Sequence, residues 1–123
     1  YDLLIGLDLT IFASYYEPWG YTPLESAAFG IPTITTNLAG FGLWCSTEQV
    51  DISNGVAVIH RNDTNYFEAA DSIKDNIIQF ANMKKKEVQE CSKKALDLAK
   101  DCSWDTFISY YMDAFQIASK KKN

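Results

Sequence analysis

The first 60 residues contain no lysine and no arginine, although they carry six acidic side chains. All eleven basic residues lie at or beyond Arg61, where ten acidic residues accompany them. Proteins bind nucleic acids mainly by neutralising phosphates with cations, so we expect no nucleic-acid partner for the N-terminal half. A phosphate site in that half must depend on backbone N–H groups and helix ends, or on cations from another part of the protein.

Long apolar runs and metal-ligand patterns are absent as well. No apolar stretch reaches the ~18–20 residues that a membrane span needs. No basic region precedes the first apolar stretch, so neither a signal peptide nor membrane association is expected. The three cysteines are widely spaced and form no metal pattern with His60, the single histidine. We therefore expect a reduced, cytoplasmic chain that needs no metal and no cofactor.

Three short, almost continuously apolar segments predict β-strands at residues 9–12, 33–36 and 56–59. A helix at residues 22–29 is predicted between the first two, with Gly30 at its end. This strand–helix–strand order implies parallel strands with a right-handed crossover. Residues 2–7 could add one or two helical turns, and residues 37–55 are predicted to be loops around a short helical piece. The predicted fold class is α/β, with a partial Rossmann-like parallel sheet.

From Asp63 onward the spacing of apolar residues becomes helical. Three amphipathic helices are predicted, and Ser103 is the expected N-cap of the third. Their apolar faces are Phe67, Ala70, Ile73, Ile77 and Phe80; Val88, Cys91, Ala95, Leu98 and Cys102; and Trp104, Phe107, Ile108, Tyr111, Phe115 and Ala118. Three strands are few for this many helices. Because the chain also begins with Tyr1 rather than Met, we expect it to be part of a longer polypeptide.

The most informative segment runs from residue 14 to residue 25, between the first predicted strand and the first long helix. Open α/β sheets bind ligands at this edge, beyond the carboxyl ends of the strands. Thr22, Pro23 and Glu25 fit the N-cap, N1 and N3 positions of a capping box. A helix that begins there points free N–H groups and the positive end of its dipole at the loop, which suits a phosphate.

Each of these residues also has a purely structural interpretation. Glu25 alone would be a capping residue, Glu17 a solvated loop acid and Gly20 an ordinary turn glycine. His60 would lie on the surface, and the lysine runs at 84–86 and 120–122 would be solvated. The aromatic residues of the segment could simply pack against the core; they are Tyr15, Tyr16, Trp19 and Tyr21.

Taken as a whole, the segment favours a functional interpretation over a purely structural one. Residues 17–25, Glu-Pro-Trp-Gly-Tyr-Thr-Pro-Leu-Glu, closely resemble the Glu-x7-Glu signature of the glycogen synthases that use UDP-glucose. Residues 30–32, residues 36–42 (Thr-Asn-Leu-Ala-Gly-Phe-Gly), and Trp104 with Tyr110 and Tyr111 also resemble that family. Glu-x7-Glu alone is shared by many retaining glycosyltransferases, whereas the two longer strings together are far more specific. The resemblance covers nearly the whole chain but only the last part of a synthase.

The resemblance implies a two-domain glycosyltransferase of the B type. Residues 1–102 would form the nucleotide-sugar-binding Rossmann-like domain, incomplete at its N-terminus. Residues 103–123 would form a C-terminal helix that leans toward the acceptor domain. The implied reaction transfers glucose from a nucleotide diphosphate sugar, UDP-glucose by this resemblance, to the non-reducing 4-OH of an α-1,4-glucan with retention. The implied partners are the nucleotide-diphosphate glucose and the glucan acceptor.

Site roles follow from the same resemblance, position by position. Glu17 would be the catalytic residue, beside the transferred glucose and its oxocarbenium-like charge. Backbone N–H groups around Trp19, Gly20 and Tyr21 would hold the sugar and the phosphates. Thr22 would face the diphosphate, and Glu25 would reach the ribose hydroxyls. No metal is implied, since helix-end donors and upstream cations would neutralise the diphosphate.

Two departures from the family pattern stand out. Ala13 occupies a position where many relatives have proline, with little consequence for chemistry. No arginine follows Arg61, where effector-regulated members carry an arginine-rich helix, so activation by glucose 6-phosphate is not expected.

Two other functions are compatible with the sequence: another retaining glycosyltransferase, and a non-catalytic domain that binds nucleotide sugars or other proteins. We also expect self-association through an exposed sheet edge or through the apolar face of the last helix.

Overall fold

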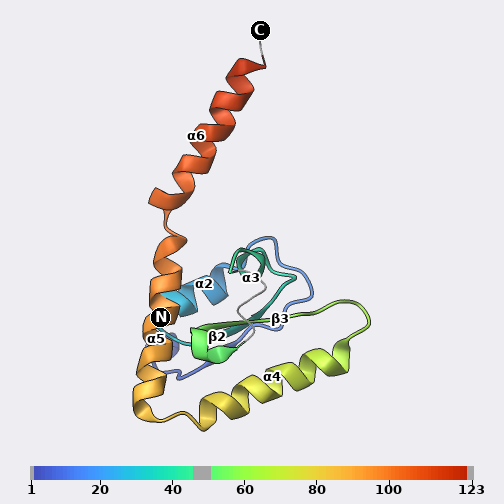
Figure 1. The fold of residues 1–123 in the computed structure, drawn as a ribbon, viewed down its shortest axis with the longest axis vertical. Helices are drawn as coiled ribbons and strands as arrows, with labels where there is room; N and C mark the ends of the chain where they lie inside the picture. The colour runs from blue at the N-terminus through green and yellow to red at the C-terminus, as the bar shows by residue number, and fades with distance from the viewer. Residues whose placement is uncertain (1, 46–50, 122–123) are drawn as a thin grey trace.

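The computed structural model describes residues 2–45 and 51–121 (Figure 1). The part of the predicted 37–55 loop region at residues 46–50 lies outside the described residues. The elements in chain order are α1 (Asp2–Ile5), β1 (Thr10–Ile11), α2 (Tyr21–Ala28), β2 (Thr33–Thr36), α3 (Gly40–Trp44), the 3-10 helix η1 (Ile52–Asn54), β3 (Val56–Ile59), α4 (Tyr66–Ala81), α5 (Lys85–Asp101) and α6 (Trp104–Lys120).

The strands form a parallel sheet in the order β1-β2-β3, which confirms the predicted α/β class. Thr33 at the centre pairs with Thr10 on one side and with Val56 on the other. The second and third strands have their predicted bounds. The first is shorter than residues 9–12, because only Thr10 and Ile11 pair with β2. The arrangement is that of a partial Rossmann-like domain.

Helices cover both faces of this sheet. Figure 1 shows α4 on one side of the strands and α2 and α3 on the other, with α5 running past one end. Successive side chains of a strand point to opposite faces. Val56 and Val58 accordingly join a core cluster with Ala95 of α5, whereas Ala57 and Ile59 join a second cluster with Ala69 of α4. Burial on both faces explains why these strands are almost continuously apolar.

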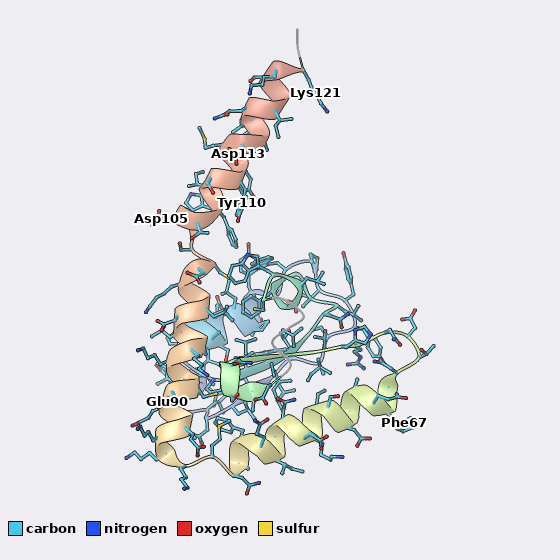
Figure 2. The ribbon with its side chains drawn as sticks, in the orientation of Figure 1. Phe67, Glu90, Asp105, Tyr110, Asp113 and Lys121 are labelled. Carbon is cyan, nitrogen blue, oxygen red and sulfur yellow. The ribbon has the colours of Figure 1, made fainter. Side chains whose placement is uncertain are left out.

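The predicted apolar face of α4 is partly wrong. Ile73 and Phe80 pack against the core as predicted, together with Ala69, but Phe67, Ala70 and Ile77 are exposed. Phe67 lies near the α4 end that is farthest from α5 (Figure 2). The polar Asn76 is buried in place of an apolar neighbour. Its Oδ1 accepts a hydrogen bond from the Ile52 N–H at 2.8 Å, a contact that hydrophobic periodicity does not reveal.

The predictions for α1, α5 and the start of α6 agree more closely with the structure than the prediction for α4. α5 buries Cys91 and Ala95 as predicted, and also Ala99, which the predicted face did not include. α1 forms within residues 2–7. The Ser103 hydroxyl accepts a hydrogen bond from the Thr106 N–H, which confirms Ser103 as the N-cap of α6. α6 projects away from the sheet, and none of its residues is buried (Figure 1). Within the described residues, no helix is long and apolar enough to cross a membrane.

Gly55 sits where β3 approaches α5 most closely. Its φ of 87° lies in the left-handed region that side chains other than glycine rarely adopt. A Cβ atom at this position would also collide with the backbone nitrogen of Ala95 and the carbonyl oxygen of Cys91. The absence of a side chain at Gly55 therefore lets the central sheet and α5 share one core.

We expect Gly55→Ala to lower the free energy of unfolding by about 2–4 kcal/mol, because it combines backbone strain with overpacking. Urea denaturation followed by circular dichroism measures this change. Gly6→Ala is the matched control, since its Cβ would meet nothing closer than the Leu3 carbonyl oxygen at 3.6 Å. Equal stability of the two variants would show that the contact between Gly55 and α5 does not constrain the fold.

Candidate functional site

Two loops meet beyond the carboxyl ends of β1 and β2. The Glu17 N–H donates to the Leu38 carbonyl at 3.2 Å, and the Gly40 N–H donates back to the Glu17 carbonyl at 3.2 Å. A third bond runs from the Phe41 N–H to the Trp19 carbonyl. A Cβ on Gly40 would collide with the carbonyl oxygen of Pro18, so glycine is needed for this close pairing. The loop that carries Glu17 is thus held by the segment from residue 38 to residue 41.

Glu17 is half-buried, and its carboxylate lies close to Gly20. Its Oε2 accepts a hydrogen bond from the Ser14 hydroxyl at 3.3 Å. The Thr36 hydroxyl donates to the Ser14 carbonyl at 2.8 Å, which ties this stretch to the end of β2. The same Oε2 would lie 3.5 Å from a Cβ placed on Gly20. One acidic side chain therefore stands next to the residue at which α2 begins.

The predicted capping box is wrong. α2 begins at Tyr21, one residue earlier than expected, and its N-cap is Gly20 with no hydrogen bond from a capping side chain. Gly20 has a φ of 101° and turns the chain directly into the helix. Pro23 then lies within the first turn, where a missing N–H costs no intrahelical bond. Glu25 is exposed, and its carboxylate has no hydrogen-bond partner among the described residues.

The other predicted site residues point in different directions. The Trp19 ring faces inward, edge-on to Phe41 and to Phe107 of α6 with centroids 6.4 and 5.5 Å apart, so its side chain is a packing aromatic. Tyr21 is 71% exposed, and Thr22 is exposed as well. The structure therefore brings the Glu17 side chain and the backbone of residues 19–21 together at the start of α2. It leaves the side chains of Tyr21, Thr22 and Glu25 at the surface.

Sequence reasoning missed Arg61 as a residue of this region. Arg61 follows β3, and its Nη1 donates to the Ala13 carbonyl at 2.7 Å. Its guanidinium carbon lies 3.5 Å from the centroid of the Tyr15 ring, a cation–π contact. The position of Arg61 shortly after the third predicted strand could have indicated this, because residues that follow parallel strands lie at the same edge of the sheet. His60 is exposed, as its structural interpretation predicted.

An open groove of about 460 Å³ lies beside Trp19, between α2 and the start of α6. Tyr110 of α6 is one of its walls, whereas Asp113 and Lys121 lie farther out along the helix (Figure 2). The lining is mainly aromatic and apolar: Trp19, Tyr21, Leu24, Cys102, Trp104, Phe107, Tyr110 and Tyr111. The groove therefore adjoins the loop that carries the predicted site.

Thiol chemistry is disfavoured throughout the described part of the chain. Burial raises the pKa of Cys45 to about 12, with a smaller contribution from the neighbouring Cys102. Burial also raises the pKa of Cys102 to about 12. The Cys91 pKa is raised by burial too, and its thiol donates to the Ile52 carbonyl. Among the described residues, no group of three or more His, Cys, Asp and Glu side chains could hold a metal ion.

Comparison with known proteins agrees with these local features. A family model described as glycogen synthase matches residues 1–123. The chain belongs to the glycogen synthase family. It is 30% identical over 122 residues to the glycogen [starch] synthase of Neurospora crassa, covering 98% of this chain and 17% of that relative. It is 30% identical over 126 residues to isoform 1 of Saccharomyces cerevisiae, covering 98% of this chain and 18% of that relative.

A liver glycogen [starch] synthase of Rattus norvegicus is 39% identical over 80 residues, which are 64% of this chain and 11% of that relative. The chain thus spans less than a fifth of the length of the curated glycogen synthases that it matches. Membership of the glycogen synthase family confirms the resemblance drawn from the loop motifs. The activity of the whole protein is a separate question.

We expect all three cysteines to react slowly with a thiol reagent in the folded chain at pH 8, because raised pKa values leave very little thiolate. In denaturant all three should react at once. Time-resolved labelling with a chromogenic disulfide, read by absorbance, measures both rates. Fast labelling of one native thiol at the rate of a free peptide cysteine would contradict the burial described above.

Proposed function

We propose that this chain forms the nucleotide-sugar-binding part of a glucosyltransferase. The longer protein would transfer glucose from UDP-glucose to the 4-OH of an α-1,4-glucan with retention. The observation that carries this proposal is the half-buried Glu17 carboxylate beside Gly20, at the start of α2. A fixed negative charge next to a set of helix N–H donors is suited to a sugar that becomes positive while its diphosphate leaves as an anion.

Glu17 is proposed as the catalytic residue. An oxocarbenium-like transition state gains positive charge at the sugar, and a positioned carboxylate stabilises that charge more than it stabilises the neutral ground state. The hydrogen bond from Ser14 and the pairing with residues 38–40 restrict the orientations that the carboxylate can take. Because these constraints exist before the donor binds, little reorganisation is needed during the reaction.

The donor diphosphate is proposed to bind at the first turn of α2. The first N–H groups of a helix lack intrahelical partners, and no side chain caps α2. Trp19, Gly20 and Tyr21 would contribute backbone N–H groups, and the exposed Thr22 would add a hydroxyl. Glu25 would accept hydrogen bonds from the ribose hydroxyls; its carboxylate is exposed and not engaged in capping, which supports this role.

We also propose a division of the chain into two functional parts. Residues 1–102 would carry the donor site, and residues 103–123 would lean toward an acceptor domain. The support is the change of chain direction at Ser103, after which α6 projects away from the sheet with no buried residue (Figure 1).

A cytoplasmic location is proposed as well, because the three cysteines are free and buried.

The complete protein is expected to release UDP from UDP-glucose in the presence of glycogen, and Glu17→Gln should lower its kcat by ~10²-fold or more. Glu25→Gln should act mainly on KM, raising it by about tenfold for the loss of a hydrogen bond to a charged group. A coupled assay of UDP release over a range of UDP-glucose concentrations separates the two effects. Glu68→Gln, an exposed acid in the first turn of α4, is the matched control and should leave both constants unchanged.

Two outcomes would overturn these assignments. Identical kinetic changes for the Glu17 and Glu25 variants would reject the separate roles. Absence of glucan-dependent UDP release from the wild-type protein, with intact binding of UDP-glucose in a titration, would reject glucosyl transfer and leave only a binding domain.

Self-association is proposed for the 123-residue chain. The β1 edge is unpaired within the described residues, and Ile11 is 42% exposed there. None of the residues of α1 is buried. α6 offers a second apolar surface, on which Tyr111 and Phe115 are 52% and 64% exposed. Unpaired edges and exposed apolar faces both favour contacts between copies.

Sedimentation velocity at micromolar concentration should show species heavier than the 13.9 kDa monomer. Ile11→Lys places a charge on the sheet edge and Phe115→Lys places one on α6, so the variant that restores a monomer identifies the contact surface. Gln116→Lys adds the same charge to α6 at a polar position and should have little effect. A wild-type chain that sediments only as a monomer would refute the proposal.

A further inference from the structure

Arg61 ties together the ends of all three strands. Its backbone N–H donates to the Asn37 Oδ1 directly after β2, and its Nη1 donates to the Ala13 carbonyl after β1. Its own place in the chain is two residues after β3. The guanidinium carbon also lies over the ring of Tyr15, 3.5 Å from its centroid, and Tyr15 belongs to the same loop segment as Ala13. Arg61 therefore bridges the end of β2, through its backbone N–H, and the first part of the loop that leads to Glu17, through its side chain.

Burying the charged Arg61 side chain costs free energy. The residue is only 7% exposed, and within residues 2–45 and 51–121 it forms no salt bridge with a carboxylate. Its Nε is buried with no hydrogen-bond partner in the structure. Buried charges are normally paired, and most buried polar atoms are satisfied. A carbonyl oxygen and an aromatic face compensate this cation only in part, so stability alone does not account for an arginine here.

The segment that Arg61 holds leads directly to the Glu17 carboxylate. Ala13 and Tyr15 flank Ser14, whose hydroxyl donates to Glu17 Oε2 at 3.3 Å. The Thr36 hydroxyl holds the Ser14 carbonyl from the other side at 2.8 Å. Any shift of residues 13–15 therefore moves the hydrogen-bond donor that orients Glu17.

We infer that Arg61 is a positioning residue, which clamps residues 13–15 so that Ser14 orients the Glu17 carboxylate. The catalytic part of this inference rests on the proposed role of Glu17. Arg61 acts through the loop and not by touching the donor, since its Nε is enclosed by protein and its Nη1 is engaged by Ala13. A guanidinium can place its central carbon over the Tyr15 ring while its Nη1 donates to the Ala13 carbonyl, whereas the ammonium group of lysine has a single nitrogen for both contacts.

The kinetic test compares Arg61→Met and Arg61→Lys in the complete protein. Arg61→Met should lower kcat by ~10–100-fold with KM for UDP-glucose changed less than about twofold, because a misplaced catalytic group affects chemistry more than binding. Arg61→Lys should restore only part of the activity. Lys74→Met removes an exposed positive charge from α4 and is the matched control, with no expected change. An increase in KM with unchanged kcat would overturn the inference in favour of direct donor contact.

A second measurement does not depend on activity. Amide hydrogen exchange in Arg61→Met should accelerate at Glu17, whose N–H is bonded to Leu38, while Thr33, bonded to Gly55 in the sheet, stays protected. Tyr15→Leu removes the stacking ring and should reproduce this local change if Arg61→Met fails to fold. Unchanged exchange at Glu17 in a folded variant would refute the clamp. Faster exchange in a protein without glucosyl transfer would support the clamp and reject only the proposed function.

Discussion

The pairing of two loops beyond the sheet is the constraint on which the site depends. Backbone bonds between residues 17–19 and 38–41 hold the Glu17 loop in place. They form only because Gly40 has no side chain to strike the Pro18 carbonyl. The same pairing brings Trp19 against Phe41 and hence against the core. The Glu17 loop is thus held by backbone hydrogen bonds and by the neighbouring Trp19 ring, which packs on the core.

Charge is distributed in an unusual way around this pairing. The first 60 residues contain no lysine and no arginine, yet a cation lies at their sheet edge because Arg61 reaches back from the end of β3. A parallel sheet makes this possible, since the carboxyl ends of all its strands meet at one edge. Arg61 is held by a carbonyl and a tyrosine ring and not by an acid. The acidic Glu17 is therefore left without an ion pair among the described residues.

The chain belongs to the glycogen synthase family, and its described residues differ in how firmly they pack. The site elements lie on rigid parts: a strand end, a helix start and a paired loop. α6 is different, because it leaves the sheet and exposes both polar and apolar residues. A helix of this kind is stabilised more by contacts with other surfaces than by its own sequence. The body of the domain and α6 are therefore stabilised in different ways.

Local patterns in the sequence were sufficient for the strands at residues 33–36 and 56–59, the Ser103 cap and the Glu17 loop. Each depends on neighbouring residues, whose spacing and propensity act over a few positions. Only the tertiary structure decided that Gly20 and not Thr22 is the N-cap of α2, that Asn76 is buried in α4, and that Arg61 belongs to the sheet edge. Asn76 is buried because it accepts a hydrogen bond from Ile52, 24 residues away, and Arg61 donates one to Ala13, 48 residues away. The start of α2 is set by the left-handed backbone of Gly20. Periodicity describes which side chains share a face, but long-range hydrogen bonds and steric contacts determine which of them is buried.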